Sequence, residues 1–174
     1  MSKLHLVSTN VHKRRVNDLI GNNDYKNIHN IGSISLHNIS ATKMLKKNNF
    51  LDGIGMPRAP YILVTIHPET IDLKMNAGLI SSTLEALDTV ELNKLLTLPN
   101  NDTNSDIMRK QIAKRKDRKD YFIFESLGVD GYFNAIRHCQ FMFGNSSSGI
   151  IESMHFGKYA INVGDRQLGR EANK

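Results

Sequence analysis

The chain has 174 residues, of which 40% are hydrophobic and 23% are charged, and its formal net charge is +6 at pH 7. This length is enough for one sizeable core and too short for two full domains. The positive charge suits an anionic partner, but no nucleic-acid-binding motif accompanies it, so we expect no nucleic-acid partner.

The cysteine content and the hydropathy pattern limit the cellular setting. Cys139 is the only cysteine, which excludes an intramolecular disulfide and gives no support to an oxidising compartment. No apolar stretch is long enough to span a membrane, and the first residues lack a signal-peptide pattern. We therefore expect a cytoplasmic protein that contacts no membrane.

The first sixty residues predict two strands and two helices. Residues 4–7 form a short apolar run typical of a strand, and the basic stretch 13–20 is followed by a glycine that would end a helix. Residues 27–31 predict a second strand, and residues 38–48 predict a second helix. The glycine- and proline-containing stretch that follows is expected to be a loop.

From residue 61 onward, short apolar runs alternate with amphipathic segments. The continuous apolar run 61–66 is typical of a strand that is covered on both faces. The further predicted strands are 95–98, 121–124, 140–143 and 159–163. The predicted helices lie around Ile80, Leu84 and Leu87, over 103–119, around Tyr132, Ile136 and Cys139, and over 149–156. This alternation predicts an α/β fold with a Rossmann-like parallel sheet.

Polar residues follow several of the predicted strands. The carboxyl ends of parallel strands meet at one edge of a sheet, and ligands bind there in α/β folds. The residues in question are His67, Asn100 with Asp102, the loop Asn145-Ser146-Ser147-Ser148, and Asp165 with Arg166. The sequence therefore predicts a binding site at this edge.

The loop 144–149 gives the clearest local signal. A glycine, an asparagine, three serines and a glycine between a strand and a helix offer backbone N–H groups and hydroxyls to a phosphate. Alternatively, Ser147 or Ser148 only caps the helix. The loop lacks the lysine of a nucleotide-hydrolase P-loop, so that mechanism is disfavoured.

Three further side chains each allow a binding and a structural interpretation. Glu152 either accepts hydrogen bonds from a ribose diol or only interacts with the helix dipole. Arg166 either clamps a diphosphate or forms a salt bridge with Asp165. His67 either donates to a phosphate or transfers a proton, or it only satisfies local hydrogen bonds.

Four motifs in the chain together resemble those of a known enzyme family. They are His-Pro-x-Thr at His67-Pro68-Glu69-Thr70, Pro-Asn-x-Asp at Pro99-Asn100-Asn101-Asp102, Gly-Asn-Ser-Ser-x-Gly-x-x-Glu from Gly144 to Glu152, and Asn-x-Gly-x-Arg-Gln-x-Gly-Arg from Asn162 to Arg170. In this order the motifs resemble the hydrolysing UDP-N-acetylglucosamine 2-epimerases that begin sialic-acid synthesis. The resemblance covers nearly the whole chain and is weakest between Asn38 and Arg58.

The resemblance implies a two-domain fold of the glycosyltransferase-B type, of which this chain supplies the C-terminal, UDP-binding domain. Residues 1–10 would be the end of the N-terminal domain or the junction, and residues 11–174 the Rossmann-like C-terminal domain, truncated at its end. The UDP-binding residues that the resemblance implies are His67, Asn100, Ser146, Ser147, Glu152 and Arg166. It also implies a catalytic role for His67.

The reaction that the resemblance implies is elimination of UDP from the sugar and addition of water, which yields N-acetylmannosamine and UDP without a metal or redox cofactor. The family's main catalytic carboxylates lie in the N-terminal domain, so we expect the isolated chain to be inactive. The implied partners are UDP or UDP-N-acetylglucosamine, and the missing N-terminal domain or a full-length homologue. UDP-diacetylbacillosamine as the parent's substrate, a non-catalytic nucleotide-binding remnant, and a homo-oligomer stay open.

Overall fold

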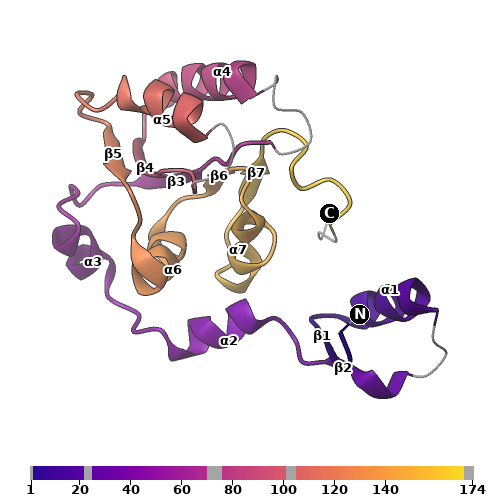
Figure 1. Ribbon diagram of the computed structural model, residues 1–174. Helices are drawn as coiled ribbons and strands as arrows, with labels where there is room; N and C mark the ends of the chain where they lie inside the picture. Colours follow the sequence, from indigo (N-terminus) through magenta and orange to yellow (C-terminus); the bar gives the residue numbers. More distant parts are fainter. Residues whose placement is uncertain (1, 22–24, 70–75, 101–104, 171–174) are drawn as a thin grey trace. The chain divides into compact units, whose positions relative to one another are not determined.

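The computed structural model describes residues 2–21, 25–69, 76–100 and 105–170 (Figure 1). The chain divides into two compact units, Met1–Thr42 and Lys43–Lys174. In the described residues, no helix has the length and apolar character that a membrane crossing requires.

The unit Met1–Thr42 contains a two-stranded parallel sheet and the helices that flank it in sequence. Strands β1 (His5–Val7) and β2 (Ile28–Asn30) pair in parallel and are connected through helix α1 (Asn10–Ile20). The short 3-10 helix η1 (Tyr25–Asn27) precedes β2, and helix α2 (Ile34–Ala41) follows it. The two strands and the first helix expected from the sequence are confirmed, with ends shifted by up to three residues.

The prediction of a single helix over residues 38–48 is wrong. Helix α2 ends at Ala41, and helix α3 (Lys47–Gly53) begins six residues later. The break occurs at Thr42, whose backbone is extended and whose hydroxyl donates to the carbonyl of Asn38 at 3.0 Å. The side chain thus takes the acceptor that the next helical N–H would use, which is how a threonine competes with helix formation.

The unit Lys43–Lys174 contains a five-stranded sheet in the order β5-β4-β3-β6-β7, in which all neighbours are parallel. Its strands are β3 (Tyr61–Thr65), β4 (Asn93–Thr97), β5 (Tyr121–Phe124), β6 (Met142–Gly144) and β7 (Ala160–Asn162). The α/β fold with a parallel sheet is therefore confirmed. Strands β3, β4 and β5 follow one another toward one edge of the sheet, and the chain then returns to place β6 on the other side of β3.

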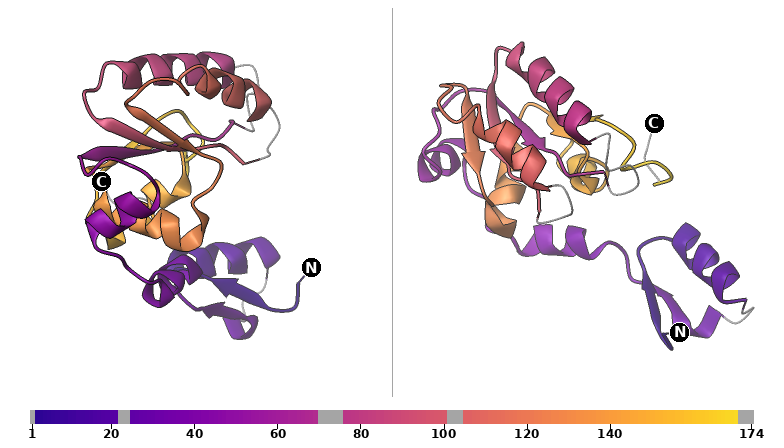
Figure 2. Two further views of the ribbon diagram at one scale, coloured as in Figure 1. Left: turned by 90° about the vertical axis from the view of Figure 1, so that its left-hand side faces the viewer. Right: turned by 45° about the horizontal axis from the view of Figure 1, so that its top comes forward.

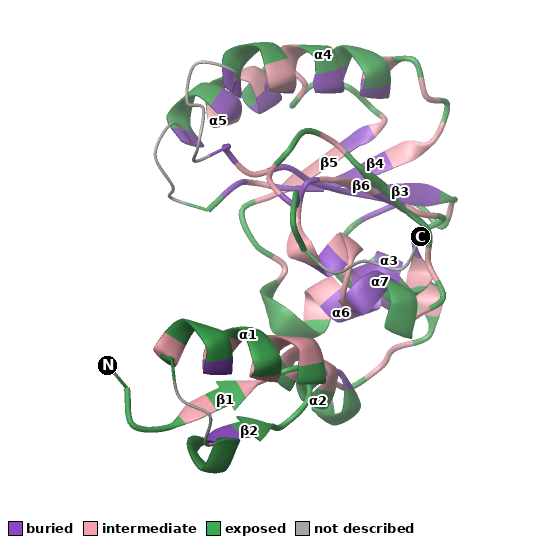
Figure 3. Ribbon diagram, turned by 90° about the vertical axis from the view of Figure 1, so that its right-hand side faces the viewer, coloured by how far each residue is buried: buried purple, intermediate pink, exposed green. Residues whose placement is uncertain are grey.

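Helices cover both faces of this sheet. Helices α4 (Asn76–Asp88) and α5 (Ser105–Ala113) lie on one face, and α3, α6 (Gly128–His138) and α7 (Glu152–His155) lie on the other (Figures 1 and 2). The central strand β3 is buried along its whole length, as Figure 3 shows. Its apolar run is continuous because helices exclude water from both faces. The edge strand β7, by contrast, has three exposed residues.

The core on the α4 and α5 side contains the predicted apolar helix face. Ile80, Leu84 and Leu87 of α4 are at most 1% exposed and pack with Ile62 and Val64 of β3. Burial of each such side chain contributes roughly 1.5–3 kcal/mol, so this layer is a main source of the stability that holds the strand ends in place.

Two helices predicted from the sequence are shorter in the structure. The basic helix expected over 103–119 is α5, which ends at Ala113 and is followed by turns. The helix expected over 149–156 consists of a 3-10 turn, η3 (Ser147–Gly149), and the four-residue helix α7. After α5, Arg115 and Arg118 pair with Asp88 and Asp120, which lie outside that helix. Before α7, Ser146 caps the 3-10 turn. Helical propensity therefore does not decide where either helix ends.

Glycine is required at the end of β6. Gly144 has a φ of +139°, and a Cβ built there would lie 1.9 Å from the carbonyl oxygen of Thr65. Strands β3 and β6 pair at these two residues. A larger residue would separate the strands at the point from which the serine loop leaves the sheet.

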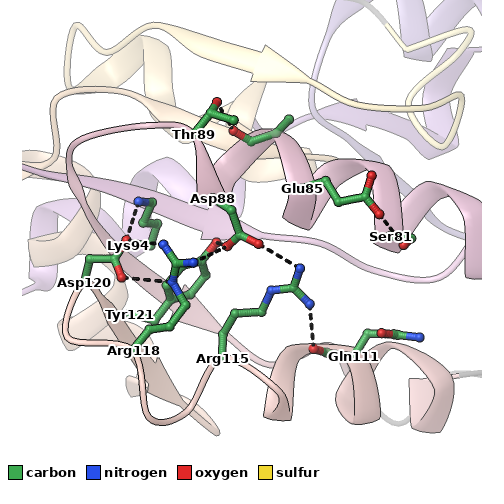
Figure 4. Close-up of polar contacts among 11 residues, drawn as sticks. Ser81, Glu85, Asp88, Thr89, Lys94, Gln111, Arg115, Arg118, Asp120 and Tyr121 are labelled. Atoms are coloured by element: carbon green, nitrogen blue, oxygen red, sulfur yellow. Dashed lines mark hydrogen bonds and ion pairs between the residues drawn. The ribbon is translucent and has the colours of Figure 1, made fainter.

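Charged side chains form a network at the amino ends of β4 and β5 (Figure 4). The side chain of Lys94 is fully buried in β4, and its ammonium lies 2.7 Å from Asp120. Arg118 pairs with the other oxygen of Asp120 at 3.1 Å. Hydrogen bonding from Arg118 is the main cause that lowers the pKa of Asp120, and Lys94 adds to it.

A second carboxylate extends this network to α4. Asp88 accepts hydrogen bonds from Arg115 at 2.9 Å and from the hydroxyl of Tyr121 at 2.7 Å (Figure 4). Burial acts to raise the pKa of Asp88, but the hydrogen bonds from Arg115 and Tyr121 outweigh it, so the pKa is lowered. The basic stretch after α5 is therefore partly committed to ion pairs within the fold.

Candidate functional site

The carboxyl ends of β3, β4 and β6 surround a cavity of about 380 Å³. His67 follows β3, Asn100 follows β4, and Ser146 follows β6, and all three line the cavity together with residues of the β5–α6 connection and of α6. Parallel strands end at the same edge of the sheet, so residues more than 30 positions apart in sequence converge there. This is the edge at which the sequence predicts a binding site.

The serine loop is ordered by its own side chains. Ser146 has an extended backbone and precedes η3, and its hydroxyl oxygen accepts the N–H of Ser148 at 3.4 Å. The hydroxyl of Ser148 donates to the same oxygen at 2.8 Å. Ser146 is therefore the capping residue, where the sequence suggested Ser147 or Ser148. Ser147 is the first residue of η3 and is half-buried.

A row of five hydroxyl groups connects the serine loop to the central strands. The hydroxyl of Tyr132 lies 2.7 Å from that of Ser148 and 3.1 Å from that of Thr65. The hydroxyls of Thr65 and Thr97 are 3.0 Å apart, which extends the row from α6 across β3 to β4. Thr65, Thr97, Tyr132 and Ser146 all line the cavity.

Burial keeps the Tyr132 hydroxyl protonated. Desolvation is the largest cause that raises its pKa, opposed by the hydrogen bonds with Ser148 and Thr65, while the nearby charge of Glu152 raises the pKa further. The group is thus a neutral donor and acceptor at neutral pH. The cavity wall formed by this row offers hydrogen bonds without a net charge.

Buried amides fix the strand end that carries His67. The side chain of Asn145 is fully buried; its oxygen accepts the N–H of His67 at 2.7 Å, and its amide donates to the carbonyl of His67 at 2.8 Å. Gln167 donates to the carbonyl of Asn145 at 2.6 Å. These bonds connect the ends of β3 and β6 and the turn after β7 to one another. They fix the backbone of His67, from which the imidazole extends.

Three predicted residues, Ser147, Glu152 and Arg166, lie outside the lining of this cavity. Glu152 is 9% exposed at the start of α7, and its charge acts on Tyr132, which does line it. Arg166 is half-buried, and within the described residues it forms no ion pair with Asp165. The salt-bridge alternative for Arg166 therefore does not hold. The N–H of Arg166 donates instead to the carboxylate of Glu69.

A second cavity is also lined by part of the serine loop. It has a volume of about 480 Å³ and shares Thr65 and Ser146 with the first. Gly144 and Gln167 also line it, together with residues of α7 and β7. Ser146 thus has access to both cavities, whereas Ser147 lines neither. Asp102 and Thr70, which belong to two of the sequence motifs, lie outside the described residues.

The sequence reasoning missed the groups that hold the site together. Tyr132 was assigned to an apolar helix face, and its hydroxyl bonds appear only once α6 packs beside the serine loop. Asn145 and Gln167 lie inside the motifs, but no pattern in the sequence reveals that their side chains bond to backbone groups. Within the part of the chain that the structure describes, no three histidine, cysteine or acidic side chains gather as metal ligands do.

Comparison with known proteins finds one family across the whole chain. The family model described as UDP-N-acetylglucosamine 2-epimerase matches residues 1–174. A GDP/UDP-N,N'-diacetylbacillosamine 2-epimerase (hydrolyzing) of Campylobacter jejuni is 32% identical over 98% of this chain and 45% of its own length. A UDP-N-acetylglucosamine 2-epimerase of Neisseria meningitidis is 28% identical over 100% of the chain and 45% of its own length.

A solved structure shares the fold. The S. aureus MnaA-UDP co-structure superposes with a TM-score of 0.68 and 18% sequence identity, over 97% of this chain and 44% of that one. The chain therefore spans less than half the length of the relatives that it matches.

Proposed function

Since the chain belongs to the UDP-N-acetylglucosamine 2-epimerase family, we propose that Lys43–Lys174 binds UDP at the carboxyl ends of β3, β4 and β6. The proposal rests above all on one observation, namely that Ser146, His67 and Asn100 converge on a single cavity lined by hydroxyl groups. Neutral donors of this kind suit a nucleoside diphosphate, whose anionic oxygens accept hydrogen bonds from hydroxyl and backbone N–H groups.

Each predicted residue has a role in this proposal. Ser146 and Ser147, with the amides of their loop, would bind the diphosphate, and Glu152 would hold the ribose. His67, Asn100 and Arg166 would line the nucleotide pocket, and His67 would also take part in proton transfer. Because α7 has only four residues, its dipole is a minor contribution, and the hydroxyls and turn amides carry the phosphate binding.

We further propose that the whole protein is a hydrolysing epimerase and that this chain alone does not turn over substrate. The chain spans about 45% of its curated relatives, and the resemblance assigns the main catalytic carboxylates to the other domain. The parent reaction would convert UDP-N-acetylglucosamine and water to N-acetylmannosamine and UDP. UDP-diacetylbacillosamine is a second candidate substrate, which the 32% identity to the Campylobacter jejuni enzyme favours.

Calorimetry with UDP tests the binding site directly. We expect the wild-type chain to bind UDP and the double variant Ser146→Ala/Ser147→Ala to bind it about a hundredfold more weakly, because the two hydrogen bonds to a charged ligand contribute about 1.5 kcal/mol each. Ser82→Ala, an exposed serine of α4, is the matched control and should bind like the wild type. Absence of UDP binding by the folded wild-type chain would overturn the proposal.

An activity assay separates the fragment from a complete enzyme. We expect no release of UDP from UDP-N-acetylglucosamine by this chain, and measurable release would contradict its proposed dependence on the other domain. Adding a polypeptide that carries that domain distinguishes a functional part from a non-catalytic remnant. Restored turnover supports the first, and UDP binding without any turnover supports the second.

A further inference from the structure

The carboxylate of Glu69 connects two loops that are almost one hundred residues apart in sequence. Its Oε1 atom accepts the N–H of Asp165 at 3.0 Å and the N–H of Arg166 at 3.1 Å. Glu69 is 8% exposed, so its charge is held almost entirely by groups of the protein. A buried carboxylate that accepts two successive backbone donors fixes the turn that supplies them.

The backbone of Glu69 is itself held in place. Asn76, the first residue of α4, is fully buried. Its side-chain oxygen accepts the N–H of Glu69 at 2.6 Å, and its amide donates to the carbonyl of Glu69 at 3.0 Å. Helix α4 therefore fixes the backbone of Glu69. The carboxylate of Glu69 is thus a rigid support for the turn.

The turn is adapted to approach this carboxylate. Gly164, directly before Asp165, has a φ of +73°, and a Cβ built there would lie 2.5 Å from Oε1 of Glu69. Only glycine allows both the backbone conformation and the close approach. The far end of the same turn is also held, because Gln167 donates to the carbonyl of Asn145 in the serine loop. Arg166 thus lies between two fixed points.

We infer that Glu69 is a positioning residue, which orders the turn 164–167 so that Arg166 meets the diphosphate of the bound nucleotide. This inference rests on the proposed UDP site. A turn that is ordered before binding lowers the entropic cost of fixing a long cationic side chain against the ligand. Glu69 acts through the turn and does not bind the ligand itself. Its carboxylate accepts backbone N–H groups of the protein, and a carboxylate would repel a phosphate.

A double-mutant cycle tests whether Glu69 acts through Arg166. We expect Arg166→Ala and Glu69→Ala each to weaken UDP binding about tenfold, and the double variant to bind no more weakly than Arg166→Ala alone, because both changes remove the same interaction. Glu69→Gln should bind within about twofold of the wild type, since the amide oxygen still accepts both N–H groups. Additive losses, or Glu69→Ala binding like the wild type, would overturn the inference.

Binding of uridine distinguishes a positioning role from a general loss of structure, because a damaged fold would weaken uridine and UDP binding alike. Because uridine has no diphosphate, its binding should be the same in Glu69→Ala and in the wild type, and a parallel loss for uridine and UDP would contradict the positioning role. Gly164→Ala disturbs the same contact from the other side and should reproduce the selective loss of UDP if Glu69→Ala does not fold. Failure of the wild-type chain to bind UDP would instead count against the proposed function.

Discussion

The two ends of the sheet in Lys43–Lys174 carry clusters of polar groups of different kinds. At the amino ends of β4 and β5, Asp120 pairs with the fully buried Lys94 and with the more exposed Arg118. At the carboxyl ends, hydroxyls such as those of Thr65 and Tyr132 form a row along the wall of a cavity. Both regions are well supplied with hydrogen bonds, and the groups of the second also line a cavity.

This difference shows that burial and polarity alone do not identify a binding site. At the amino end the charged groups pair with one another, so their interactions contribute to folding. The carboxyl-end groups are held by the fold and still line open space. If the distinction is correct, changes at the amino end alter stability without altering UDP binding, and changes at the carboxyl end do the reverse.

The largest effect should follow from breaking the amino-end network. Asp120→Asn removes the carboxylate next to the fully buried Lys94. We expect a loss of about 2 kcal/mol in the free energy of unfolding, less than for a fully buried pair because the Asp120 side chain is 34% exposed and solvent screens its charge. UDP affinity of the folded variant should be unchanged. Denaturant unfolding and calorimetry measure the two quantities.

Asp52→Asn is the matched control for Asp120→Asn. Asp52 pairs with Arg58 on the surface, where both side chains are about half exposed or more, and solvent screens such pairs. We expect its unfolding midpoint to equal that of the wild type. Equal losses for the two variants, or weaker UDP binding by Asp120→Asn, would remove the contrast between the two ends of the sheet.

A smaller effect should appear on acidification. The folded-state pKa of Asp120 is lowered from its ordinary value of 3.8, so its ionised form stabilises the fold above about pH 4, and this contribution is lost as the pH falls from there toward the folded pKa. The stability gap between the wild type and Asp120→Asn should therefore narrow below pH 4. Denaturant titrations between pH 7 and pH 3 measure it, and a constant gap would contradict the assignment.

The smallest effect concerns the carboxyl end. Tyr132→Phe removes the hydroxyl between Thr65 and Ser148, and we expect UDP to bind about fivefold more weakly, which corresponds to roughly one hydrogen bond. Uridine should bind as before. Tyr159→Phe, at a side chain that is 85% exposed, is the control. Calorimetry that finds equal losses for UDP and uridine would assign Tyr132 a purely structural role.

Sequence patterns predicted the parts of the fold that burial dictates. The run 61–66 became β3 because five consecutive residues are enclosed between two layers of helices. The helix expected over 38–48 failed because a single side chain, that of Thr42, competes for a helical carbonyl. Such competition depends on local geometry that hydrophobic spacing does not encode.

The candidate site was predictable where a residue follows a strand, and not where a residue acts through another. His67, Asn100 and Ser146 stand at strand ends, so the topology of a parallel sheet brings them together. Glu69 occupies the variable position of the motif His-Pro-x-Thr, and its contact with Arg166 joins residues 97 positions apart. Only the folded arrangement of β3 and β7 places these groups next to each other.

The hydroxyl row has a direction. Each hydroxyl carries one proton, and that of Ser148 is committed to Ser146. If all of these bonds form at once, Ser148 accepts from Tyr132, Tyr132 from Thr65, and Thr65 from Thr97. All the O–H dipoles then point toward the serine loop and reinforce one another. An acceptor placed beside Ser146 meets the positive end of this aligned chain, whereas a cation there would face reversed dipoles. We therefore expect the row to favour an anion over a cation beside Ser146, through groups that bear no charge themselves.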